Sequence, residues 1–238
     1  TALAKGVNVA GLAVGASEAW ATTGSEVTAS VSGTITTINL SILAQKTQQG
    51  TDDNSNATAW ASSGSLIGIN ATVSKAFDYS EVRALVSTNS KLIIDGLLTL
   101  SAVNSGKQTA TGNNEVVIGL ILAVGGSSAE ATSNTITEAR FSDTVTVQGG
   151  GTIEISAYAS DDNIVVVSAG GGGAIAGSST HSKAISNGTT TAGLGAGNII
   201  DSVNFSVEAT HVAKGSSDVD ALTIGVISGS GVYTTNNV

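Results

Sequence analysis

The 238-residue chain contains no proline, no cysteine and no methionine, and only 3% of its residues are aromatic. Average usage of about 5% proline would give roughly a dozen prolines in a chain of this length. Because proline cannot donate a backbone hydrogen bond, its absence favours sheet ladders along nearly the whole chain. The lack of cysteine excludes a disulfide framework, thiol catalysis and thiolate metal sites.

Charge is also scarce, since charged residues make up 11% of the chain and the net charge is −9. The nine lysines and arginines are scattered from Lys5 to Lys214 without a cluster, so we expect no binding to nucleic acid. The longest apolar run, residues 116–124, is far shorter than the roughly 20 residues of a membrane span, and we expect no membrane insertion. Neither a signal peptide nor an initiator Met is present, which suggests a mature chain or an excised segment.

What the chain does have is an internal repeat. A strand-like segment with a central alanine recurs around Ala29, Ala84, Ala139 and Ala192, at steps of 55, 55 and 53 residues. A second segment keeps the same rhythm, with alternating apolar and polar residues before Ala44, Ala102, Ala157 and Ala209. Two elements in phase over four copies indicate a repeat architecture, in which each unit buries its apolar face against its neighbours.

Strand patterns dominate, and no stretch has the apolar spacing of an amphipathic helix. We therefore predict an all-β fold, a parallel β-solenoid (right-handed β-helix) made of four repeats of about 55 residues. A single domain covers residues 1–238, with repeat units at residues 7–60, 61–115, 116–168 and 169–227. A β-sandwich with Greek-key connections is the structural alternative.

The sequence is compatible with two widths for one rung of the solenoid. One unit could form about three narrow rungs of roughly 18 residues each, giving a rod of roughly 55–60 Å, or it could form one wide rung. We favour narrow rungs, because the small side chains Ala, Gly, Val and Ser are not expected to fill a wide interior.

Glycine- and alanine-rich rungs, strands that end in alanine, turns rich in Asp and Asn, and the absence of Cys and Pro resemble the shaft repeats of filamentous bacterial adhesins. These are the filamentous-haemagglutinin-like and leukotoxin-type adhesins that two-partner or autotransporter routes secrete. The resemblance covers residues 1–238 and rests on amino-acid composition, strand pattern and repeat length, not on a diagnostic motif. It implies a right-handed parallel solenoid outside the cell, serving as a stalk or an adhesive fibre.

Clusters of Asp and Asn are the first candidates for a site. The segments 52–54, 161–163 and 218–220 are interpreted as turns that recur near one phase of the repeat. Their carboxylates could hold calcium, which prefers six to eight oxygen ligands. We favour capped turns and predict no metal site, with weak calcium candidates at Asp52, Asp53, Asp161, Asp162, Asp218 and Asp220.

Other candidates for chemistry are sparse. The two histidines, His181 and His211, could act as general bases, but no nucleophile motif accompanies them and we interpret them as surface or turn residues. The pairs Glu81/Arg83 and Glu138/Arg140 recur at equivalent positions, which indicates a surface ion ladder. The glycine runs at 170–173 and 193–197 resemble phosphate loops only superficially and predict tight turns or close backbone approach. The aromatic residues Trp20, Trp60, Tyr79 and Tyr158 are too widely spaced to predict a stacking platform.

The sequence thus predicts a non-enzymatic extracellular or cell-surface protein without cofactors, either a shaft segment or a self-stacking filament subunit. Its expected partners are copies of itself, adjoining solenoid domains, or host and cell-surface glycans and proteins. The alternatives are a solenoid enzyme that degrades polysaccharides and a glycan-binding module.

Overall fold

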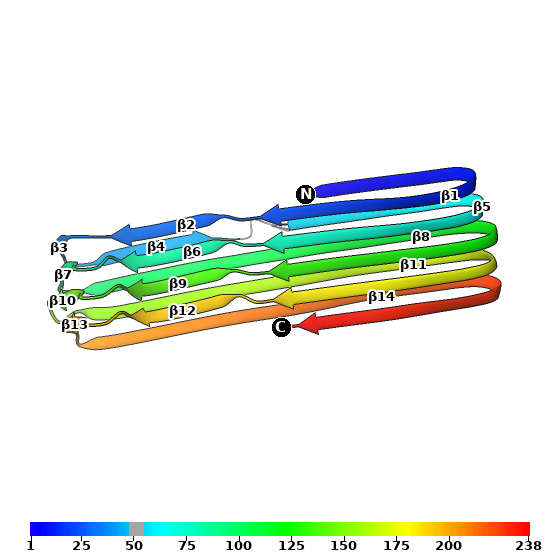
Figure 1. Cartoon of the computed structure of the whole chain (residues 1–238). Helices are drawn as coiled ribbons and strands as arrows, with labels where there is room; N and C mark the ends of the chain where they lie inside the picture. Colours follow the sequence, from blue (N-terminus) through cyan, green and yellow to red (C-terminus); the bar gives the residue numbers. More distant parts are fainter. Residues whose placement is uncertain (48–54) are drawn as a thin grey trace.

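Long parallel strands build almost the entire molecule in the computed structural model, which describes residues 1–47 and 55–238 (Figure 1). None of these described residues forms a helix, and hence none forms a helix able to cross a membrane. The strands are β1 (Ala2–Thr23), β2 (Glu26–Val31), β3 (Thr34–Thr37), β4 (Leu40–Lys46), β5 (Ser55–Asp78), β6 (Glu81–Val86), β7 (Lys91–Ile94), β8 (Leu97–Ser133), β9 (Ile136–Phe141), β10 (Thr146–Gln148), β11 (Thr152–Ser186), β12 (Thr189–Leu194), β13 (Ile199–Ile200) and β14 (Asn204–Asn237).

Three parallel sheets stack these strands in layers. The largest sheet has the order β1-β5-β8-β11-β14, with β4 also paired to β8, and the other two have the orders β12-β9-β6-β2 and β13-β10-β7-β3. Every strand pair among the described residues is parallel. The Greek-key sandwich is therefore wrong for this chain, because its sheets are antiparallel.

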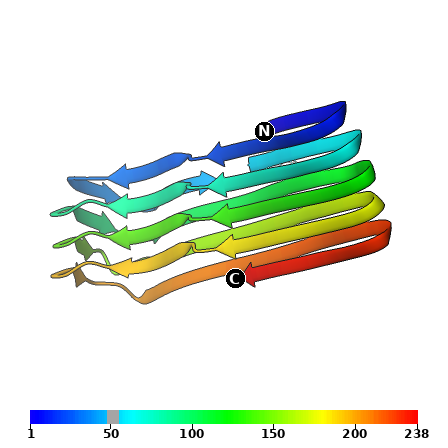
Figure 2. The same ribbon diagram turned by 45° about the vertical axis from the view of Figure 1, so that its right-hand side comes forward.

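The five long strands fold back on themselves. Each runs outward, reverses at one end of the molecule and returns beside its own first half, so that the strands form a flat double-walled arm (Figures 1 and 2). We call the two halves the outgoing and the returning leg. The short strands close the opposite end, which we call the head. β4 pairs there with the first part of β8, and β5 pairs with the next part, through Leu40–Leu98 and Ser55–Gln108.

The prediction of narrow rungs is wrong. Paired residues in adjacent layers are 52 to 58 positions apart, as in Thr152–Asn204, Ala2–Ala57 and Leu40–Leu98, and not roughly 18. The physical reason is that the arm is flat. Asn114 Nδ2 of the outgoing leg donates to Gly126 O of the returning leg at 3.2 Å, so the two walls lie close enough for small side chains to fill the space between them.

Two apolar cores match these two regions. In the arm, buried alanines with Val165 and Val167 line the space between the legs. In the head, where three sheets surround a wider interior, larger side chains such as Leu100, Phe141 and Ile155 are buried. Side-chain volume thus follows local width, and the predicted repeat-unit boundaries near 61, 116 and 169 fall inside β5, β8 and β11.

Candidate functional site

A buried polar cluster separates the two cores. We call it the polar junction, and it consists of Lys46, Asp78, Ser80, Gln108, Ser133, Thr135, Asp161, Asn163 and His211, of which all but the partly exposed His211 are buried. Its members come from the end of β4, from the ends of the returning legs of β5 and β8 with the residues just after them, and from inward positions of the outgoing legs of β8, β11 and β14. Burial of so many polar groups is tolerated only when they are paired.

Its first half is an ion pair embedded in hydrogen bonds. Lys46 Nζ lies 2.7 Å from Asp78 Oδ2, and the side chain of Asp78 is 0% exposed. Gln108 Nε2 donates to the same carboxylate oxygen at 3.0 Å, while the backbone N–H and the hydroxyl of Ser80 donate to the other oxygen. The charge of Asp78 is thus fully compensated inside the protein.

The second half is centred on Asp161 and His211. Asp161 Oδ2 accepts from Ser186 Oγ at 2.9 Å and lies 3.1 Å from His211 Nε2, while His211 Nδ1 lies 3.2 Å from Thr190 Oγ1. The hydroxyl of Thr190, the imidazole of His211 and the carboxylate of Asp161 therefore form one chain of hydrogen bonds, which fixes the orientation of the imidazole ring. Sequence reasoning missed it because its members are 21 and 50 residues apart.

The calcium candidates are not brought together. Asp52 and Asp53 lie outside the described residues. Asp161 and Asp162 lie within β11, and Asp218 and Asp220 lie within β14, so the interpretation of these segments as turns is wrong. They do not occupy equivalent positions of the repeat either, since Asp161 pairs with Ala213 and Asp218 pairs with Val166. Among the residues that the structure describes, no group of three acidic, histidine or cysteine side chains could hold a metal.

The turn prediction failed at Asp161–Asn163 because the alternation of the strand places Asp161 and Asn163 inward. There Asp161 accepts a hydrogen bond from Ser186 Oγ and Asn163 Nδ2 donates to Ile185 O, so both polar groups are paired within the strand stack. The carboxylates of Asp162, Asp218 and Asp220 lie at outward or edge positions of their strands.

The predicted ion ladder is confirmed. Arg83 pairs with Glu81 of its own strand at 2.6 Å and with Glu138 of the neighbouring strand at 3.4 Å, and Arg140 pairs with Glu138 at 2.9 Å. These partly exposed groups connect β6 and β9 across the head surface. Pairs of this kind stabilise strand register only modestly.

Aromatic side chains gather where the sequence did not predict it. Phe77 lies with its ring centroid 6.4 Å from that of Trp20 and 6.0 Å from that of Tyr79. Lys75 Nζ lies 4.6 Å from the Trp20 ring, and Trp20 Nε1 donates to Glu18 at 2.6 Å. The 55-residue register places Trp20 beside Lys75, which a search of neighbours in sequence could not reveal.

His181 lies in the returning leg of β11, with its ring 5.0 Å from that of Tyr233 in the next layer. The glycine run at 170–173 lies in β11 just before its reversal, and Gly197 adopts a positive φ of 71° beside the last head strands. The predicted close approach of two backbone segments is confirmed at Gly173, because a Cβ there would overlap the carbonyl oxygen of Gly119. Neither glycine segment precedes a helix, so a phosphate loop is not formed.

In the described part of the chain, the two ends of the stack expose backbone hydrogen-bonding groups without strand partners. β1 and β14 each pair with only one long strand and leave their other backbone edges free of partners among the described residues. Side chains that stack on buried residues of the neighbouring layer are exposed to solvent at these ends. Phe205 and Val207 stack on the buried Ile153 and Ile155 yet are 44% and 40% exposed. Comparison of the chain with protein-family models, with curated proteins and with solved structures gives no match.

Proposed function

We propose that this chain is a non-enzymatic structural protein, a parallel β-solenoid whose layers are turns of about 55 residues and whose ends extend by stacking. It serves as a shaft segment or a filament subunit outside the cell. The observation that carries the proposal is the open state of both end strands, β1 and β14, which resemble middle layers in pattern but have a partner on one side only. Such edges are templates for further strand pairing.

The regular columns of like side chains support a mechanical role. Ala2, Ala57 and Ala110 stack through the arm, and Leu40, Leu98, Ile153 and Phe205 stack through the head. Each added layer pairs its backbone with the previous layer and buries one further member of every column. The adhesin-like texture of the sequence supports the extracellular location, which fractionation of source cells would test.

The stacking proposal is tested at the free edge of β14. Val232 is 57% exposed and continues an inward column, since it pairs with the buried Thr180, so a lysine there places a charge against the incoming strand. We expect Val232→Lys to abolish concentration-dependent growth of rods, measured by sedimentation velocity and electron microscopy.

The matched control is Gly231→Lys on the adjacent outward position, where nothing lies within 4 Å of an added Cβ. It adds the same charge and should grow like the unmodified chain. If the unmodified chain shows no growth at any concentration, end-to-end stacking of copies is wrong, and the shaft-segment form of the proposal stands alone.

A second candidate is a glycan-binding surface, favoured by the Trp20, Phe77 and Tyr79 cluster. Trp20 is 56% and Tyr79 is 48% exposed, so flat apolar rings lie open beside the polar groups of Glu18 and Lys75. Aromatic faces with a few placed polar groups suit sugar rings. Tryptophan fluorescence titrated with an oligosaccharide panel tests it. Trp20→Ala should abolish the response, and Trp60→Ala, outside the cluster, should retain it.

A further inference from the structure

The outer face of the arm near its reversal is corrugated. At the level of Val9 the outward positions of the outgoing legs alternate from layer to layer between large aliphatic residues and glycine, whereas next to the reversal Leu66 of β5 and Leu120 of β8 are both large and exposed. Three ridges carry exposed aliphatic side chains: Val7 and Val9 on β1, Ile118 and Leu120 on β8, and Leu222, Ile224 and Val226 on β14.

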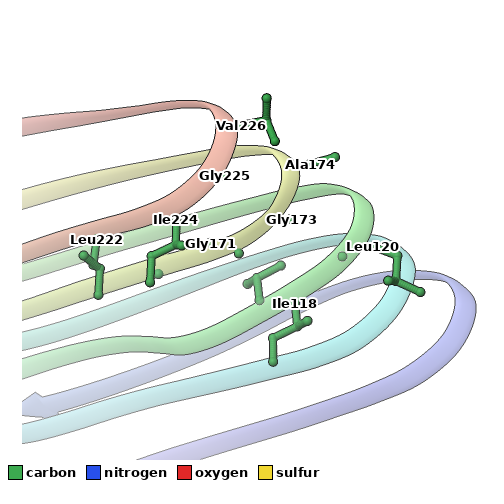
Figure 3. A pocket seen from close by; sticks show the side chains of 13 residues that line it. Ile118, Leu120, Gly171, Gly173, Ala174, Leu222, Ile224, Gly225 and Val226 are labelled. Atoms are coloured by element: carbon green, nitrogen blue, oxygen red, sulfur yellow. The ribbon is translucent and has the colours of Figure 1, made fainter.

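Two grooves separate the ridges. On β5 the outward positions between the β1 and β8 ridges are the small residues Ser62 and Gly64, which we call the β5 groove, and the exposed Leu66 follows them at the reversal. The β11 groove has Gly170, Gly172 and Ala174 as its floor and a volume of about 840 Å³ (Figure 3). The lining of the β11 groove is entirely Gly, Ala, Val, Ile and Leu, without one polar side chain.

Strand register aligns ridges and grooves at the same height along the arm. Gly172 pairs with Ile118 on one side and with Ile224 on the other. On the far side of β8, Gly64 pairs with Ile118 and also with Val9. Figure 3 shows the labelled glycines of β11 lying between Ile118 and Leu120 on one side and Leu222, Ile224 and Val226 on the other.

We propose that this corrugated face binds the same face of a second copy of the chain, with the β8 and β14 ridges of each copy in the β11 and β5 grooves of the other. A two-fold axis parallel to the strands reverses the order of the layers and keeps positions along the strands aligned. Placed between β8 and β11, that axis sets β8 of one copy against β11 of the other, and β14 against β5. Every contact then occurs twice, as in an isologous dimer.

The shapes favour this occupant. Facing sheets pack at about 10 Å, a gap that a large side chain opposite a glycine fills and that two large side chains opposite one another do not fit. Charges agree as well. In this arrangement Lys5, at the edge of the face, lies one strand away from Asp220 of the second copy, since both occupy the same height along the arm.

The size of the face indicates a weak pair. β1 has no strand opposite it in this arrangement, so four strands at about 4.8 Å and five residues at about 3.3 Å give a footprint of roughly 320 Å² per copy, well below the standard size of a stable interface, as in a weak and transient pair. Exposed apolar patches of this order on a monomer mark interaction sites. Because each added layer adds footprint, pairing of longer stacks would strengthen through multiple contacts.

The test uses the full chain carrying Val232→Lys, so that growth at the stack ends does not contribute. Sedimentation velocity over increasing concentration should show reversible dimers. Gly172→Leu fills the β11 groove, and the fold has room for it, because only Ile224 O lies near an added Cβ, at 4.0 Å. We expect it to raise the dimer dissociation constant at least about tenfold. The control Gly193→Leu, a strand glycine of the head with nothing within 4 Å, should leave the constant unchanged.

A complementary pair sharpens the test. Ile118→Ala trims the ridge that faces Gly172 of the other copy, so mixing it with Gly172→Leu should give heterodimers with near-original affinity, while each variant alone dimerises poorly. A chain that stays monomeric at every concentration overturns the proposal, and so does a Gly172→Leu variant that dimerises like its parent. Either result leaves end-to-end stacking intact, because that process is read from chains without the Val232→Lys change.

Discussion

At the residue scale, the polar junction concentrates the stability that single side chains control. Lys46 compensates the carboxylate of Asp78, which is completely buried. Lys46→Met would leave that charge unpaired, and we expect a loss of about 3–5 kcal/mol in the free energy of unfolding, measured by urea denaturation.

The double variant Lys46→Met with Asp78→Asn should recover much of that loss, because no buried charge remains. The exposed Lys91 of β7 provides the control, and its replacement by Met should stay within about 0.5 kcal/mol. Equal effects at Lys46 and Lys91 would show that the ion pair does not stabilise the junction.

Two neighbouring glycines, Gly172 and Gly173, differ in the space around them. A Cβ at Gly173 would overlap Gly119 O where the arm reverses, whereas a Cβ at Gly172 meets only Ile224 O at 4.0 Å. We expect Gly173→Ala to lower stability by about 1–3 kcal/mol through overpacking. Gly172→Ala should be neutral or slightly stabilising. Thermal unfolding followed by circular dichroism at 218 nm distinguishes the two, and indistinguishable melting curves would contradict the packing at the reversal.

At the element scale, one column of side chains spans a gradient of burial. Ile155 of β11 is 1% exposed, and Val207, its partner in β14, is 40% exposed. Ile155→Ala should cost about 2–5 kcal/mol because it creates a cavity in the head core. Val207→Ala should cost less than about 1 kcal/mol in the dispersed chain, since its site is already open to water. Denaturant titration at low protein concentration measures both, and a larger cost at Val207 would mean that the end layer is covered.

Strand identity and pairing step could be predicted from the sequence, and the reasons lie in particular residues. The step from Ala29 to Ala84 to Ala139 is the register of β2, β6 and β9, because residues that stack in one column experience the same space and so resemble one another. Proline's absence also agrees with backbone ladders that extend through nearly all described residues.

The width of a layer could not be predicted, because small residues are compatible with two shapes. They fill a narrow rung, and they also fill the flat space between two walls, as Ala110 and Ala131 do in the arm. Only the fold-back of the long strands decides between these shapes, and no local signal in Gly119 or Gly173 distinguishes a reversal from an ordinary strand glycine.

The polar contacts were equally hidden. Asp161 carries a strong turn signal in Asp-Asp-Asn, yet its partners Ser186 and His211 are 25 and 50 residues away. Proximity of that kind follows from the register and the fold-back together, so it becomes predictable only once both are known. The same holds for Trp20 and Phe77, which join an aromatic cluster across two layers.

At the scale of the whole molecule, the two ends of the stack are open to pairing in one direction, and the arm face is open in another. Under the two proposals, end growth would lengthen a rod, whereas face pairing would double it. The two proposed processes involve different residues, Val232 for the first and Gly172 for the second, so each can be removed while the other remains.

The unequal depth of the sheets has a consequence for any fibre of identical copies. Five long strands stack in the arm, and four stack in each of the two head sheets. Copies that meet arm to arm therefore leave a notch one strand deep beside β12 and β13 at every junction. Fibre diffraction would then add a meridional repeat of about 24 Å, five strand spacings, to the reflection at about 4.8 Å. An uninterrupted covalent ramp would give the strand spacing without this longer repeat.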